Sequence, residues 1–154
     1  MLGKGDAVGD LRFSDSEGKE HRLSEFADKR AVILFFYPMD FSPGCTKEAC
    51  HFRDYYREIC DLGGVVFGVS TDSVERHKQF KEKHHLPYPL IADANKSLSK
   101  TFGVRRLWGL LGNKRVTFVV APDGRILEAI HSELSMSTHV ERVIEVLKQL
   151  KESQ

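Results

Sequence analysis

The chain has 154 residues, of which 41% are hydrophobic and 29% are charged, and its formal net charge is +1. This length and composition predict one globular domain over residues 1–154 with a continuous core. The near-neutral charge argues against nucleic-acid binding, which usually requires a basic excess. No apolar run is long enough to span a membrane and no secretory signal is visible, so we expect a cytoplasmic protein that does not bind membranes.

The first half of the chain predicts a hairpin, two buried strands and a helix. Residues 11–23 contain Ser-Glu-Gly-Lys between two short strand-like runs, which is typical of a hairpin. The apolar run over 31–37 predicts a strand that is covered on both faces. After a loop between two prolines, the apolar positions from Cys45 to Ile59 recur at helical spacing and predict one helix. Residues 65–69 predict a second buried strand.

The second half of the chain continues to alternate helices and strands. The pattern predicts, in order, a helix over 73–84, a strand over 90–92, a helix over 97–102, and two strands over 116–120 and 126–130. The last helix is predicted to begin at a capping box formed by Thr138 and Glu141. Alternating strands and helices favour parallel pairing, whereas the late hairpin adds antiparallel strands. We therefore predict an α/β fold with a central mixed sheet flanked by helices.

The cysteines and histidines do not form a metal site or a structural disulfide framework. Three cysteines, Cys45, Cys50 and Cys60, are an odd number, and none of their spacings is Cys-x-x-Cys. The seven histidines are scattered without the spacing of metal ligands, so we expect them at the surface. The sequence predicts neither a metal nor an organic cofactor.

Cys45 is predicted to lie in the first turn of a helix. Ser42 suits the N-cap position and Pro43 the first helical position. The free N–H groups and the dipole at a helix N-terminus favour the thiolate form of a cysteine, which is its nucleophilic form. The alternative is that Cys45 is a small buried apolar residue. For Ser42, a simple capping role and a hydroxyl beside the reacting sulfur both remain open.

Cys50 follows Cys45 by five residues. On an intact helix this separation corresponds to a rise of about 7.5 Å, beyond the roughly 7 Å limit between the Cα atoms of a disulfide. Either the two cysteines never form a disulfide, or the first helical turns unwind after oxidation; we favour the second interpretation. Cys60 is expected to be a core or half-buried thiol. Arg115 opens a predicted strand and lies either in solvent or across the sheet ends from Cys45.

Residues 37–50 resemble the active-site signature of the peroxiredoxins, and most closely that of their Q-type, or bacterioferritin comigratory protein, subfamily. Pro38, Ser42 and Cys45 match the family pattern of Pro, three residues, Thr or Ser, two residues and Cys. Cys50 matches the helical resolving cysteine of the subfamily. The resemblance continues along nearly the whole chain. It implies a thioredoxin-like fold with an N-terminal β-hairpin extension.

The resemblance also implies an activity and a set of site residues. The protein would be a thiol-dependent peroxidase that reduces hydrogen peroxide and organic hydroperoxides. Cys45 would be oxidised to a sulfenic acid and then form a disulfide with Cys50, which thioredoxin would reduce. Ser42 would hydrogen-bond the peroxide, and Arg115 would be the arginine of the active site. In addition, Pro38 would shield the pocket and Glu48 would orient the arginine.

Some features depart from the family pattern or leave alternatives open. Ser42 stands where threonine is commoner, and Phe41 stands where an acidic or polar residue is frequent. The apolar segment 104–112 is predicted to be an interface, a pocket rim or a packed short helix. A thiol–disulfide carrier and a redox-responsive binding protein remain alternatives for the function. We expect a monomer or a weak homodimer.

Overall fold

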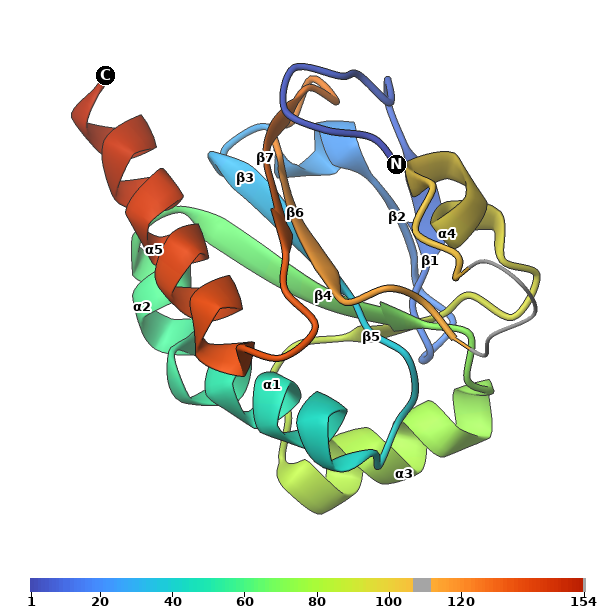
Figure 1. The fold of residues 1–154 in the computed structure, drawn as a ribbon. Coiled ribbons are helices and arrows are strands. Elements are labelled where there is room, and N and C mark those ends of the chain that lie inside the picture. Colours follow the sequence, from blue (N-terminus) through green and yellow to red (C-terminus); the bar gives the residue numbers. More distant parts are fainter. Residues whose placement is uncertain (107–111, 154) are drawn as a thin grey trace.

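The computed structural model describes residues 1–106 and 112–153 and contains a central mixed sheet (Figure 1). The sheet has five strands in the order β5-β4-β3-β6-β7. The strands are β3 (Ala31–Phe36), β4 (Gly64–Ser70), β5 (Leu90–Ala92), β6 (Val116–Val120) and β7 (Ile126–His131). β3, β4 and β5 are parallel, whereas β6 and β7 run antiparallel to their neighbours. The predicted combination of parallel strands and a late antiparallel hairpin is confirmed.

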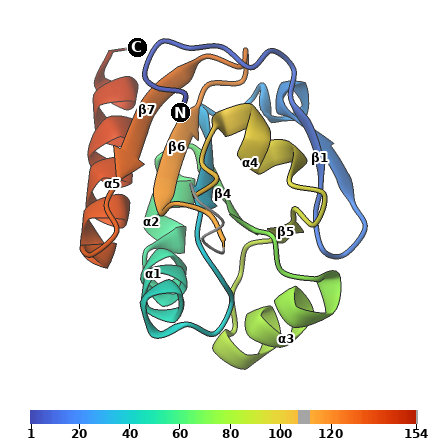
Figure 2. The ribbon, with the colours of Figure 1, turned by 45° about the vertical axis from the view of Figure 1, so that its right-hand side comes forward.

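Helices cover one face of this sheet. They are α1 (Pro43–Asp54), α2 (Tyr56–Asp61), α3 (Val74–His84) and α5 (Met136–Glu152). The other face is covered by the hairpin of β1 (Arg12–Ser14) and β2 (Glu20–Arg22), the short 3₁₀ helix η1 (Leu23–Phe26) and α4 (Ser97–Phe102). Figure 2 shows α4 and β1 on the side of the sheet opposite to α1 and α5. The β1–β2 hairpin forms its own two-stranded sheet, as predicted for the N-terminal extension.

β3 lies in the middle of the sheet because both of its faces are apolar. All six of its side chains are buried. Ile33 and Phe35 point into the core under α1, α2, α3 and α5, whereas Leu34 and Phe36 point into the core under α4 and the hairpin. A strand that is buried on both faces has no need for alternating polar residues, which is why its sequence is continuously apolar. The end of β3 therefore carries the following loop to the edge where α1 begins.

Two helix boundaries differ from the predictions. The single helix expected from Cys45 to Ile59 is divided into α1 and α2 at Tyr55, whose φ and ψ of −104° and 8° leave the helical region. The apolar residues of both helices pack on the same core, as the stripe predicts. The spacing of apolar residues does not show where the helix axis changes direction. The predicted capping box at Thr138 and Glu141 is wrong. α5 begins at Met136, and Thr138 Oγ1 lies 2.6 Å from Ser135 Oγ.

A buried hydrogen-bond network fixes the loop between β3 and α1. The hydroxyl of Tyr37 donates to Asp40 Oδ1 at 2.6 Å, and His77 Nδ1 lies 2.6 Å from Asp40 Oδ2. His77 Nε2 donates to the carbonyl of Ile91 at 2.9 Å. Because a carbonyl only accepts, His77 must carry a hydrogen on Nε2, and one further proton lies between Nδ1 and Asp40. The loop is thus tied to α3 and to β5.

The same network corrects the expectation that the histidines lie at the surface. His21, His77 and His139 are buried, and each is hydrogen-bonded through both ring nitrogens. Potential ligand atoms of Asp40, Asp72 and His77 lie within 4.8 Å of one another. They are already used, because Asp72 Oδ2 accepts from the backbone N–H of Asp40 and from the hydroxyl of Ser70. We therefore interpret this cluster as a structural network.

Within the described part of the chain, no helix combines the length and apolar character that crossing a bilayer requires.

The Asp40 network leads to a prediction about stability. Asp40→Ala leaves the Tyr37 hydroxyl and His77 Nδ1 buried without their partner, so we expect a loss of about 3 kcal/mol in the free energy of unfolding. Urea denaturation measures this loss. Asp28→Ala, at an exposed position, serves as the control and should stay within about 0.5 kcal/mol of the wild type. Equal stabilities for the two variants would contradict the structural role of Asp40.

Candidate functional site

Cys45 lies in the first turn of α1, as its lead-in residues predict. Ser42 is the N-cap, and its hydroxyl oxygen accepts from the backbone N–H of Cys45 at 3.4 Å. The same hydroxyl donates to the carbonyl of Met39 at 3.2 Å, and Pro43 is the first helical residue. The side chain of Cys45 is fully buried. The sulfur is therefore held at the positive end of the helix dipole, which stabilises negative charge there.

Arg115 lies beside this sulfur. It directly precedes β6, and its Nη1 donates to Cys45 Sγ at 3.3 Å and to Glu48 Oε1 at 3.2 Å. Only 6% of the residue is exposed, so Arg115 is not the solvated charge that remained an alternative. Gly44 permits this approach, because a Cβ at that position would lie 3.2 Å from Arg115 Nη2. The structure thus brings together three of the predicted residues, Cys45, Glu48 and Arg115.

Glu48 and Arg115, which are hydrogen-bonded to each other beside the sulfur, differ in their charge at neutral pH. Burial raises the pKa of Glu48 to about 8, although the neighbouring Arg115 lowers it in part. Burial lowers the pKa of Arg115, but the groups of Glu48 and Cys45 raise it further, so that the net change is upward. At neutral pH, Glu48 is therefore mainly protonated and Arg115 is a cation. A thiolate at Cys45 does not have to share this cation with a full carboxylate charge.

Glu133 is a further residue of the site that the sequence analysis missed. Its Oε2 accepts from the backbone N–H of Arg115 at 3.0 Å, and its Oε1 accepts from Arg106 Nη2 at 2.9 Å. Arg106 also donates to the carbonyl of Asn113 at 3.0 Å through Nε. Glu133 lies beyond β7 in the sequence and belongs to no local pattern, so only its contacts reveal it. It fixes the backbone from which the Arg115 side chain extends.

Pro38 is packed against Gly112. The φ of Gly112 is +79°, and a Cβ at this position would lie 2.5 Å from the carbonyl oxygen of Pro38. Glycine is therefore required by both the backbone conformation and the close approach. Of the predicted apolar segment 104–112, residues 107–111 lie outside the described residues. Its two described ends reach the site, because Arg106 contacts Glu133 and Gly112 contacts Pro38.

Cys50 lies on the same helix as Cys45, but in a different environment. It is half-buried and lines a pocket of about 290 Å³ together with Lys47, His51, Asp54, Met136 and Ser137. Burial raises the pKa of its thiol. Because α1 is continuous from Pro43 to Asp54, helical geometry keeps Cys45 and Cys50 too far apart for a disulfide, and all three cysteines are free. Cys60 lies in α2 and is half-buried.

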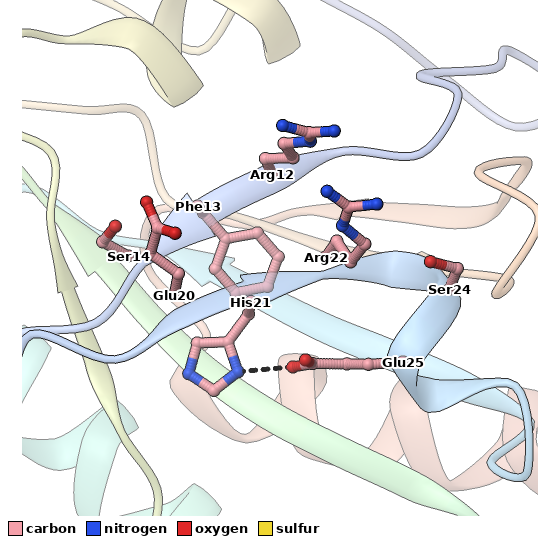
Figure 3. Close-up of a pocket in the computed structure, with 8 residues that line it drawn as sticks. All are labelled: Arg12, Phe13, Ser14, Glu20, His21, Arg22, Ser24 and Glu25. Atoms are coloured by element: carbon pink, nitrogen blue, oxygen red, sulfur yellow. Dashed lines mark hydrogen bonds and ion pairs between the residues drawn. The ribbon is translucent and has the colours of Figure 1, made fainter.

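A second pocket, of about 550 Å³, lies on the β1–β2 hairpin (Figure 3). Its lining residues include Arg12, Arg22 and His21, whose Nδ1 lies 2.7 Å from Glu25 Oε1. The hairpin packs on the face of the sheet opposite to α1, and no cysteine lines this pocket. Nothing in the lining of this pocket therefore links it to the contacts of Cys45 and Arg115.

Comparison with known proteins identifies the family of this site. The model of the AhpC/TSA family matches residues 4–129. A putative peroxiredoxin of Mycobacterium tuberculosis is 41% identical over 151 residues, which are 96% of this chain and 97% of that protein. The chain belongs to the peroxiredoxins of the AhpC/TSA family. It is accordingly a thiol-dependent peroxidase, as the resemblance of residues 37–50 implied.

Solved structures give the same result for the fold of this peroxiredoxin. The peroxidoxin BcpB of Mycobacterium tuberculosis is 40% identical, with a TM-score of 0.89 over 97% of this chain and 98% of that one. The bacterioferritin comigratory protein of Xanthomonas campestris, described with alkyl peroxide reduction activity, is 31% identical. Its TM-score is 0.81 over 94% of this chain and 98% of that one. The predicted fold class and the Q-type resemblance are confirmed.

The contact between Gly112 and Pro38 predicts a loss of peroxidase activity in Gly112→Ala. The added methyl group pushes on the loop that leads to Cys45, and we expect the second-order rate constant with hydrogen peroxide to fall about tenfold. Stopped-flow competition kinetics measure this constant. Gly3→Ala is the matched control, because a Cβ at position 3 meets no atom within 4 Å. A Gly112→Ala variant as fast as Gly3→Ala would show that this contact does not matter.

The protonation of Glu48 predicts a pH dependence of the peroxide reaction. As the pH rises through about 8, Glu48 ionises and its carboxylate competes with the sulfur for the charge of Arg115. We expect the rate constant to fall about threefold across this range. In Glu48→Gln the side chain stays neutral at every pH, so the fall should disappear. The control variant Glu58→Gln, at an exposed position on α2, should keep the fall in the rate constant. An unaltered fall in Glu48→Gln would exclude the Glu48 carboxyl group as the cause of the pH dependence.

Proposed function

We propose that Cys45 is the nucleophile that attacks the peroxide and that Cys50 resolves the product. The observation that carries this proposal is the 3.3 Å hydrogen bond from Arg115 Nη1 to Cys45 Sγ at the N-terminus of α1. Among the described residues, no arginine donates a hydrogen bond to Cys50 or to Cys60. The thiol with the raised pKa, Cys50, is less suited to the first attack.

In the first step, the thiolate of Cys45 attacks the nearer oxygen of the hydroperoxide. A sulfur–oxygen bond forms while the O–O bond breaks, so the sulfur loses two electrons and the peroxide gains them. The departing oxygen leaves as an alkoxide or hydroxide and takes up the peroxide proton, which leaves Cys45 as a sulfenate; one proton from water then gives the sulfenic acid. Arg115 Nε is buried without a hydrogen-bond partner among the described residues, so it is available to stabilise this oxygen. The hydroxyl of Ser42 is the second donor that we assign to the peroxide, and for this it must turn its hydrogen away from the carbonyl of Met39.

Two further residues complete the proposed peroxide site. Glu48 orients Arg115 through the 3.2 Å hydrogen bond between Oε1 and Nη1. Pro38 shields the sulfur from bulk water, and its half-buried position against Gly112 supports this role. Exclusion of water strengthens the electrostatic interactions within the site.

In the second step, the Cys50 thiol attacks the sulfenic acid of Cys45. A disulfide forms and one water molecule leaves, which balances the oxygen and the protons. This step requires the first turns of α1 to unwind, because the intact helix separates the two residues by about 7.5 Å along its axis. The partial exposure of Cys50 in its pocket with Met136 supports the ability of this segment to rearrange.

In the third step, a dithiol protein reduces the disulfide by thiol–disulfide exchange, and we propose thioredoxin for this role. We propose hydrogen peroxide and organic hydroperoxides as substrates, in line with the alkyl peroxide reduction activity described for the Xanthomonas relative. The cytoplasmic location, the state of a monomer or weak homodimer, the single domain over 1–154 and the lack of nucleic-acid and membrane partners stay predictions from the sequence.

A coupled assay with thioredoxin, its reductase and NADPH tests these assignments. Cys45→Ser should consume no peroxide, because it lacks the nucleophile. Cys50→Ser should react once with peroxide and then stop, because its sulfenic acid has no partner for a disulfide. Cys60→Ser should keep turnover within about twofold of the wild type, since Cys60 lies outside the site.

Mass spectrometry of the oxidised variants completes the test by locating the sulfenic acid and the disulfide. Full turnover by Cys45→Ser would overturn the assignment of the nucleophile. Full thioredoxin-dependent turnover by Cys50→Ser, together with an inactive Cys45→Ser, would overturn only the resolving role.

A further inference from the structure

His139 is a buried polar residue on the apolar side of α5. Its side chain is fully buried, and Val140 and Val143 of the same helix belong to the core under α1 and α5. Its Nε2 lies 2.8 Å from the carbonyl oxygen of Ser132, and its Nδ1 lies 2.8 Å from Thr117 Oγ1. The carbonyl only accepts, so Nε2 carries a hydrogen; in the neutral ring, Nδ1 then accepts the hydrogen of the Thr117 hydroxyl. The two partners fix both the ring orientation and the tautomer.

Nε2 of His139 also lies near Glu48. His139 Nε2 lies 3.4 Å from Glu48 Oε2, and this oxygen is buried without a hydrogen-bond partner among the described residues. The N–H hydrogen points mainly to Ser132, so the contact with Glu48 is electrostatic. The other oxygen of the same carboxyl group accepts from Arg115 Nη1. A continuous series of contacts therefore leads from α5 through Glu48 and Arg115 to the sulfur of Cys45.

We propose that His139 is a positioning residue of the peroxide site. The electrostatic contact at Nε2 favours the orientation of the Glu48 carboxyl group in which Oε2 lies beside His139 and Oε1 accepts from Arg115 Nη1, which also donates to Cys45. This inference rests on the proposed function of Cys45. His139 itself contacts neither the sulfur nor a substrate, so its effect on the reaction passes through Glu48.

The surrounding charges indicate that His139 acts as a neutral donor. Burial lowers its pKa, and Arg115 contributes in the same direction. The titratable and charged groups that face His139 and Glu48 are Arg115, Cys45, Glu133, His131 and Tyr88. The N–H dipole stabilises the carboxylate form of Glu48, so its removal raises the pH at which Glu48 ionises.

The contact between His139 and Glu48 exists only while α1 is folded. Glu48 belongs to α1, whereas His139 belongs to α5 and Arg115 precedes β6. Unwinding the first turns of α1 therefore removes Glu48 from both partners. Loss of the His139 contact should weaken the peroxide reaction, which needs the folded helix, without slowing disulfide formation, which needs the unwound helix.

The test compares His139→Leu with His139→Gln, whose amide N–H can replace the donor at Nε2. We expect His139→Leu to lower the rate constant with hydrogen peroxide at pH 7 about fivefold, and His139→Gln to lower it less than about twofold. In His139→Leu the alkaline fall in rate should move to higher pH, while the rate of disulfide formation should not decrease. His85→Gln, at an exposed position, is the control for all these measurements.

Three outcomes would overturn the proposal. The first is a His139→Leu variant within about twofold of the wild type. The second is an equal loss of rate in His139→Leu and His139→Gln with an unaltered pH profile, which would show a purely structural role. The third concerns Thr117→Val, which removes the partner of His139 Nδ1 and serves if His139→Leu does not fold. An unchanged rate and an unchanged alkaline midpoint in Thr117→Val would overturn the proposal. Failure of the proposed function would be visible separately, as turnover by Cys45→Ser.

Discussion

One nitrogen atom of Arg115 lies between the sulfur of Cys45 and the carboxyl group of Glu48. This nitrogen can serve both groups because the burial of Glu48 raises its pKa to about 8 and leaves it mostly neutral near pH 7. The positive charge of the guanidinium is then directed chiefly at the sulfur. A fully charged carboxylate in the same place would oppose a thiolate at Cys45. In the proposed mechanism, the reactivity of Cys45 therefore depends on the exclusion of water from Cys45, Glu48 and Arg115.

The surrounding fold supplies that burial from several directions. α1 brings Cys45 and Glu48 to the site, the residue before β6 brings Arg115, and α5 covers them from the side of His139. The network around Asp40 fixes the loop in front of α1, and Glu133 fixes the backbone of Arg115. Each support lies on a different element, so the site depends on the packing of the whole helical face of the sheet.

The proposed catalytic cycle places opposite demands on α1. The attack on peroxide needs the ordered N-terminus of the helix, whereas the disulfide between Cys45 and Cys50 needs that same end to unwind. Contacts that hold Glu48 and Arg115 together favour the ordered form. Their strength must be limited, because a helix that never opens would leave the sulfenic acid unresolved. This requirement is consistent with a site that relies on single hydrogen bonds and leaves Arg115 Nε without a partner among the described residues.

Local patterns in the sequence determined most of the secondary structure and the central residues of the site. The apolar run of β3, the Ser42–Pro43 helix start and the turn between β6 and β7 involve neighbouring residues, so their physical causes are visible in the sequence. The cysteine motif is equally local, because Pro38, Ser42, Cys45 and Cys50 lie on one loop and one helix. The break of the long helix at Tyr55 and the start of α5 were not predicted, because an apolar stripe does not fix a helix direction or a cap.

Only the tertiary structure decided which distant residues surround the sulfur. From the residues alone, a solvated position was favoured for Arg115 over its buried one, and Glu133, Gly112 and His139 belonged to no pattern. The buried positions of His77 and His139 contradicted the expected surface location because each imidazole finds its partners on other elements. Hydrogen bonds between residues far apart in the chain depend on how the helices pack on the sheet. Local spacing therefore singled out Cys45 as the proposed nucleophile, whereas packing placed Arg115 beside its sulfur and Glu48 beside Arg115.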